Sequence, residues 1–284
     1  MAHLPVAAAF RKGVGMLEIK MLACPHCGRE LKGSDPYITR FCSTCLHHWI
    51  LTEKGVRPLS IRRAVAETEE DLMLPFWVTS IDNRKLADDM DDAAGELRKQ
   101  KGLTAGIRLT EEDKDDPQIL FMEKSGMEKI QMLSVRRGNM KMAGHREIDN
   151  FISEIRGRSN FMVYIPAFIS SNPFAYLKAG KLLTARQPSF GTEPSASLRK
   201  PVLCSVDSSE ALALAYFVFL ASLPESILGC GKMLKNIKVQ ASSPPVLVNF
   251  PFRAGKGSLI SIIGGFSISS RLVQRPEQIG RKIL

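Results

Sequence analysis

The sequence lacks the long apolar segment that a transmembrane helix requires. Its most apolar run, residues 211–223, is shorter than a bilayer span and is followed at once by Pro224 and Glu225. We therefore expect a buried helix there and no insertion into a membrane. The opening residues 1–12 contain only a short apolar stretch, which Pro5 interrupts, so we also expect no signal peptide.

Motifs for the common kinds of catalysis are missing as well. There is no G-x-S-x-G elbow, H-E-x-x-H helix or phosphate-binding P-loop. Residues 229–232 (GCGK) come nearest to a P-loop, but they lack its upstream glycine and its final Ser or Thr. His145 is the one histidine beyond residue 48, and no nucleophile visibly pairs with it. An enzyme stays a third hypothesis, and a deep pocket lined by titratable groups would distinguish it.

The six cysteines do not suggest a disulfide framework. Cys204 and Cys230 lie in apolar surroundings, which is typical of buried free thiols. This cysteine usage fits a reducing compartment, so we expect a cytoplasmic protein.

The other four cysteines form two C-x2-C pairs, Cys24 with Cys27 and Cys42 with Cys45. Two such pairs, 14 residues apart, have the spacing of four-thiolate zinc sites. Because four thiolates fill a zinc tetrahedron and leave no position for water, we predict one structural Zn²⁺. The alternative to a zinc site is a redox-active dithiol, since a single C-x2-C pair can serve in thiol–disulfide exchange. Surface or outer-shell roles are expected for the histidines nearby, which are His26, His47 and His48.

Residues around the cysteines predict the fold of this module. Gly28 directly follows the first pair and can take a positive φ, while residues 38–41 and 49–52 read as strands. Residues 17–55 thus resemble a zinc ribbon, which implies stacked hairpins around a closed site. With the strand motifs further on, the chain also resembles an uncharacterised family of bacterial cytosolic zinc-ribbon proteins, a resemblance that implies no known activity.

The formal net charge is +10, with an acidic middle segment, residues 64–127, between basic flanks. Basic residues interleave with Tyr37, Phe41 and Trp49 around the cysteine module, as on polyanion-binding surfaces. The candidate polyanion-binding residues are Arg29, Lys32, Arg40, Lys54, Arg57, Arg62 and Arg63. The alternative is that Phe41 and Trp49 fill the small core and that the cations keep the module soluble.

The patterns predict an α+β fold in which a small N-terminal zinc ribbon precedes a mixed α/β body. We expect a disordered tail over residues 1–15 and the ribbon over 16–56. A charged, partly helical connector over 57–70 would lead into an α+β domain over 71–284. A charged insertion is expected near residues 102–116.

Periodicity and capping signals predict the elements of the body. Helices are expected over residues 83–101, from 172 onward with Pro173 in the first turn, and over 210–223 after the capping sequence 207–210. The expected strands cover residues 161–169, 201–206, 237–240, 246–250 and 259–268. In the first of these strands Pro166 predicts a bulge or a sheet edge.

Residues 74–80 and 165–171 share a pattern of apolar residues around one proline, each followed by a helix, and residues 250–252 echo it. A duplicated strand–helix unit or chance recurrence would explain the pattern. Within the first predicted helix, the carboxylates are expected to form a solvated acidic face rather than a cation site. They are Asp88, Asp89, Asp91 and Asp92.

Two main hypotheses for function follow from these observations. The first is a non-enzymatic cytoplasmic protein whose zinc ribbon acts as a protein-interaction or scaffold module and binds another macromolecule, a protein in preference to a nucleic acid. The second is a nucleic-acid-binding protein that uses the basic flanks and the ribbon, with an affinity that falls steeply as salt rises.

Overall fold

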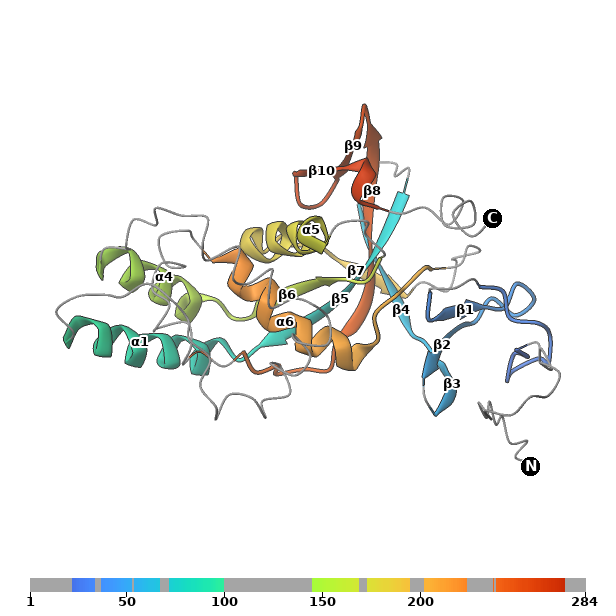
Figure 1. Ribbon diagram of the computed structural model, residues 1–284, viewed down its shortest axis with the longest axis horizontal. Coiled ribbons are helices and arrows are strands. Elements are labelled where there is room, and N and C mark those ends of the chain that lie inside the picture. The colour runs from blue at the N-terminus through green and yellow to red at the C-terminus, as the bar shows by residue number, and fades with distance from the viewer. Residues whose placement is uncertain are drawn as a thin grey trace, which may run out of the picture.

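The structure is a computed structural model with an α+β fold, built of helices, a large mixed sheet and a small N-terminal antiparallel sheet beside a cysteine cluster (Figure 1). It describes residues 22–33, 37–52, 54–66, 72–99, 145–168, 173–194, 202–223, 237 and 239–273. Among these residues no helix is both long and apolar enough to cross a membrane. The expected tail, the insertion near residues 102–116 and Cys230 lie outside the described residues.

The small sheet contains three antiparallel strands, β1 (Thr39–Phe41), β2 (His48–Thr52) and β3 (Gly55–Pro58). β1 and β2 confirm the two strands predicted for the cysteine module. Trp49 of β2 packs against Leu31 and two of the cysteines in a small apolar core. The aromatic side chain and the thiols therefore form the interior of this module together.

The large sheet is separate from the small one and begins shortly after β3 in the chain. Its strands are β4 (Ile61–Ala64), β5 (Leu72–Ile81), β6 (Phe161–Pro166), β7 (Thr192–Pro194), β8 (Val246–Gly255), β9 (Ser258–Ser261) and β10 (Ser267–Ser269), followed by a short 3-10 turn (Ser270–Leu272). β5 lies between β6 and β8, and β8 pairs on its other side with β4 and β9. β7 then pairs with β4 and β10 with β9.

β4 lies within the segment expected to be a partly helical connector, and none of that segment's described residues 57–66 is helical. Residues 61–64 form a strand that pairs with both β7 and β8. Ile61 and Ala64 are buried in the cores of the body, and such long-range pairing determines the local structure of this short segment. The placement of the domain boundaries stays a prediction.

Two prolines of the recurring motif meet where β6 ends. Pro75 of β5 accepts the N–H of Ala167, and Ala167 directly follows the last residue of β6, Pro166. In an antiparallel ladder the N and the C=O of one residue point to the same side. The missing N–H of Pro75 therefore faces the end of β6. Among the described strands β6 pairs with β5 alone, which confirms the edge that Pro166 predicted.

Pro251 lies at a comparable interruption in β8. On one side, residues 247–249 pair with β4 and residues 252–255 pair with β9. The carbonyl of Pro251 accepts the N–H of Ile262 on this same side. Pro251 therefore separates two pairing partners, which explains why a central strand tolerates a residue without an N–H.

Two helices cover β6 (Figure 1): α5 (Pro173–Arg186) lies along its free edge and contributes to both cores, and α6 (Ser208–Ser222) packs on one face. Successive β5 residues alternate between the two cores, since Phe76 belongs to the core that contains Leu183 and Trp77 to the core that contains α6. The helices also pack against each other. Asp207 and Glu210 form the capping box at the start of α6, as the sequence predicts.

The helix α1 (Asn83–Lys99) packs against α4 (His145–Gly157) rather than lying along the sheet (Figure 1). Sequence analysis missed α4, although its buried Ile148, Ile152 and Ile155 have helical spacing. α5 packs on β6 while α1 packs on α4, so the helices that follow the two motif strands have different surroundings. Arg156 of α4 bridges two of the α1 carboxylates, in keeping with a solvated acidic face.

Side chains at the end of α5 cover the free edge of β6, which is the edge that does not pair with β5. Gln187 accepts the N–H of Met162 at 2.8 Å and donates to its carbonyl at 2.6 Å, as a neighbouring strand would. Two residues further along the strand, the hydroxyl oxygen of Thr184 accepts the N–H of Tyr164. Gln187 can reach β6 because its backbone turns left-handed, at φ 45°, where α5 ends. These bonds satisfy a sheet edge that would otherwise be open.

The segment 202–206 joins the cysteine module to the body. The hydroxyl of Thr39 donates to the carbonyl of Val202 at 2.6 Å and accepts the N–H of Cys204 at 3.0 Å. Ile38 donates its N–H to the carbonyl of Cys204. The strands predicted over 201–206 and 237–240 were wrong, since the described residues of both segments lie outside any strand.

Candidate metal centre

Two cysteine turns with the same hydrogen bonds form the centre. In the first turn, residues 24–29, the N–H of Gly28 donates to Cys24 O at 2.8 Å and the N–H of Cys24 donates to Arg29 O at 2.7 Å. In the second, residues 42–47, the N–H of Leu46 donates to Cys42 O at 2.8 Å and the N–H of Cys42 to His47 O at 2.9 Å. Each turn therefore directs two sulfurs toward the other turn.

Both turns need a left-handed residue directly after their second cysteine. Gly28 takes this conformation with φ 72°, as the sequence predicts, and Leu46 takes it with φ 59°. A leucine in this region of backbone space costs about 1 kcal/mol relative to glycine. The sequence did not reveal this strain, because the second turn has no glycine.

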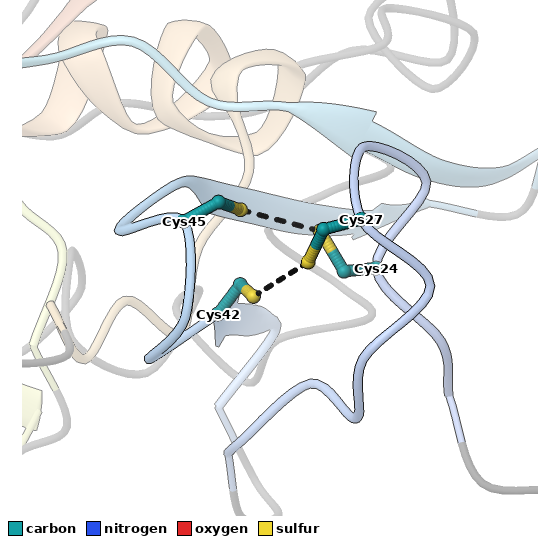
Figure 2. Close-up of side chains that lie close together, drawn as sticks. All are labelled: Cys24, Cys27, Cys42 and Cys45. Carbon is teal, nitrogen blue, oxygen red and sulfur yellow. Dashed lines mark hydrogen bonds between the residues drawn. The ribbon is translucent and has the colours of Figure 1, made fainter.

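The four thiols of these turns lie together at the end of the module, as Figure 2 shows. All four sulfur atoms lie within 4.8 Å of one another, and the closest pairs join the two turns: Cys24 Sγ to Cys45 Sγ at 3.6 Å and Cys27 Sγ to Cys42 Sγ at 3.4 Å. All four are free thiols. A zinc ion with Zn–S bonds of about 2.3 Å requires sulfurs about 3.8 Å apart, so the cluster fits a tetrahedral metal ion.

Backbone donors prepare this cluster for thiolates. Burial opposes ionisation of Cys42, but the N–H groups of Cys45 and Thr44, with nearby thiols, outweigh it and lower its pKa to about 6. Burial raises the pKa of Cys45 to about 12, helped by the neighbouring sulfurs. One thiol is thus ready to ionise at neutral pH, and a cation is needed to hold the others as thiolates.

The surroundings of the cluster differ on its two sides. Cys24 and Cys42 are buried against Trp49, whereas Cys27 is exposed. His26 and His47 lie outside, with ring centroids 4.6 Å apart, and His47 Nδ1 lies 2.9 Å from the carbonyl oxygen of Cys45. His48 is buried beside Phe41, away from the ligand set. The described residues thus place four cysteines, and no histidine, in the cluster.

The structure separates the candidate polyanion-binding residues into two groups. Arg40 is buried and donates to the carbonyls of Tyr37 and Thr39. Arg62 is half-buried and donates to Thr192, and Arg63 is half-buried with interactions of its own. The remaining four are exposed on the cysteine module: Arg29, Lys32, Lys54 and Arg57.

The aromatic residues of the proposed polyanion surface lie in the interior. Tyr37, Phe41 and Trp49 are 2%, 3% and 8% exposed. Bases stack only on aromatic faces that they can reach. The observed burial supports the alternative in which Phe41 and Trp49 fill the core, and it leaves charge as the basis for any polyanion binding.

No protein-family model, curated protein or solved structure matches this chain. Among the described residues, the cysteine cluster is the feature with the most definite chemistry.

Proposed function

We propose that this chain is a non-enzymatic, zinc-dependent interaction protein that acts in the cytoplasm and binds a partner protein through its cysteine module. The observation that carries the proposal is the set of four thiols within 4.8 Å of one another. Soft thiolates in a tetrahedral set favour zinc over harder divalent ions. Once Cys24, Cys27, Cys42 and Cys45 hold the ion, no coordination position is left for water or substrate.

A structural ion in this place would stabilise the module as a rigid surface. Zinc binding contributes on the order of 10 kcal/mol to the folding of small zinc modules. Here β1 leads directly into the second cysteine turn, and its Thr39 is bonded to residues 202 and 204 of the body. The ion therefore fixes both the shape of the cysteine turns and their orientation on the body, which favours a role in binding.

The proposal is tested by changing the cysteines in the full chain. We expect the purified protein to contain one zinc per chain and the double variant Cys27→Ser/Cys45→Ser to contain none. Affinity purification with quantitative mass spectrometry should show a set of partners lost in this variant, while circular dichroism shows that the helices of the body persist. An unchanged set of partners would rule out the interaction role.

The second candidate is a nucleic-acid-binding protein, favoured by the four exposed cations of the cysteine module: Arg29, Lys32, Lys54 and Arg57. It predicts binding to labelled DNA or RNA with an affinity that falls steeply with salt, and a shallower slope when these four residues are changed to alanine. Arg253 and Lys256, exposed near the β8–β9 turn, provide a matched control pair. Absence of binding at physiological salt would leave the protein partner as the working proposal.

A further inference from the structure

The four cysteines of the metal centre differ in how far solvent reaches them. Cys27 is exposed and Cys45 is half-buried, whereas Cys24 and Cys42 are 2% and 0% exposed. Cys27 also stands in the middle of an exposed stretch, since residues 25–30 are all exposed. A small oxidant that approaches the centre therefore meets the sulfur of Cys27 first.

Cys27 faces a buried thiol of the other turn. Its Sγ lies 3.4 Å from Cys42 Sγ, and Cys24 Sγ lies 3.6 Å from Cys45 Sγ (Figure 2). A disulfide bond is about 2.05 Å long, so a shift of about 1.5 Å within a pair allows the bond to form. Redox-sensitive cysteines typically combine an accessible thiol with such a neighbour, which resolves the oxidised sulfur. Cys27 and Cys42 fit these two roles.

A bond between two of these sulfurs is incompatible with a four-thiolate centre. Zinc held by four sulfurs has no spare ligand, so a disulfide leaves only two thiolates to hold the ion. The described residues place no histidine in the cluster that could replace the lost ligands. Oxidation of one pair therefore releases the metal.

We propose that the cysteine module is a redox switch in which a peroxide oxidises Cys27 and Cys42 resolves it. The Cys27 thiolate attacks one oxygen of hydrogen peroxide, the O–O bond breaks, and a sulfenic acid and a hydroxide form. The Cys42 thiolate then attacks the Cys27 sulfur, the S–S bond forms and a second hydroxide leaves. The two thiolates lose two electrons, which the peroxide gains.

This inference rests on the proposed function and adds the regulation of the same module. Because the ion holds the cysteine turns in shape, its release ends binding of the partner. Cys24 and Cys45 form the second disulfide with another equivalent of peroxide. A thiol reductant restores all four cysteines, and rebinding of zinc restores the module.

Hydrogen peroxide added to the zinc-loaded full chain provides the test. A coloured metal indicator follows the zinc released, and mass spectrometry of tryptic peptides maps the disulfides. Trypsin cuts after Arg29 and Arg40, so a disulfide between the turns joins two peptides and a disulfide within one turn does not. We expect the Cys27–Cys42 disulfide to form first and at the rate of zinc release. Dithiothreitol with added zinc should reverse both.

Two histidine variants separate the role of Cys27 from that of a ligand. Cys27→His keeps four ligands, in a set of three cysteines and one histidine that zinc accepts, but it lacks the exposed thiol. We expect peroxide to release its zinc at least tenfold more slowly. Cys45→His is the matched control, because it keeps both Cys27 and Cys42, and it should release zinc at about the unchanged rate.

The outcomes also distinguish the switch from the function on which it rests. Equal release from Cys27→His and the unchanged chain, or a first disulfide within one turn, would overturn the switch. If Cys27→His binds no zinc, the order of disulfides in the unchanged chain decides. A chain that holds zinc and its partners but resists peroxide would refute the switch alone, whereas a chain that binds no zinc would count against both proposals.

Discussion

Gly180 of α5 lies against the backbone of Tyr164 in β6. A Cβ atom added at Gly180 would stand 2.5 Å from the Tyr164 carbonyl oxygen and 2.8 Å from Pro166 Cδ, and 3.1 Å from a methyl group of Val218 in α6. Backbone on one side and a helix on the other leave no room for relaxation. The absence of a side chain is what lets α5 approach the sheet and α6 at once.

We expect Gly180→Ala to destabilise the protein by about 1–3 kcal/mol, because the added methyl forces α5 away from β6. Gly95→Ala is the matched control, since Gly95 is inside α1 and a Cβ there meets nothing within 4 Å. It should stabilise the protein by about 0.5–1 kcal/mol. Urea unfolding of both variants measures the difference, and equal midpoints would show that α5 does not lie this close to β6.

Gln187→Ala should expose the edge of β6. The change removes both bonds to Met162 and the 2.6 Å bond to the Thr184 carbonyl, while the left-handed backbone remains. We expect a loss of about 1–3 kcal/mol, with faster hydrogen exchange at the Met162 amide. Gln187→Gly should lose about 1 kcal/mol less, since glycine tolerates φ 45°. Unchanged exchange at Met162 would refute the role given to Gln187.

The two cysteine turns should respond in opposite ways to substitution at their left-handed positions. Gly28→Ala introduces a Cβ at φ 72° and should lower stability by about 1 kcal/mol. Leu46→Gly relieves the same strain and removes a side chain that is already exposed, so we expect unchanged or higher stability. Thermal unfolding of the zinc-loaded variants tests this, and a clear destabilisation by Leu46→Gly would mean that its side chain packs within the chain.

Removing the metal should release the module before the body. Trp49 lies in the small core with Cys24 and Cys42, whereas Trp77 lies in the large core and donates to the Val206 carbonyl. A strong zinc chelator should shift tryptophan emission to longer wavelength as Trp49 meets water. The variant Trp49→Phe, which reports Trp77 alone, should show a much smaller shift. Equal shifts would mean that the body unfolds with the module.

The sequence by itself determined the features that depend on neighbours in the chain. The C-x2-C spacing identified the four clustered cysteines, and Gly28 identified the left-handed residue of the first turn. The pair Asp207 and Glu210 gave the start of α6, because a capping box is a contact between residues three apart. Pro173 likewise marked the start of α5.

Only the tertiary structure decided what depends on residues far apart. Thr39 bonds to Cys204, 165 residues away, and nothing local announces that the cysteine module is joined to the body there. Arg40, a candidate for an exposed polyanion surface, is buried by contacts with its surroundings. Residues 61–64 became a strand for the same reason, since a short segment takes its conformation from its partners. Periodicity and spacing report local preferences, whereas long-range burial and pairing override them.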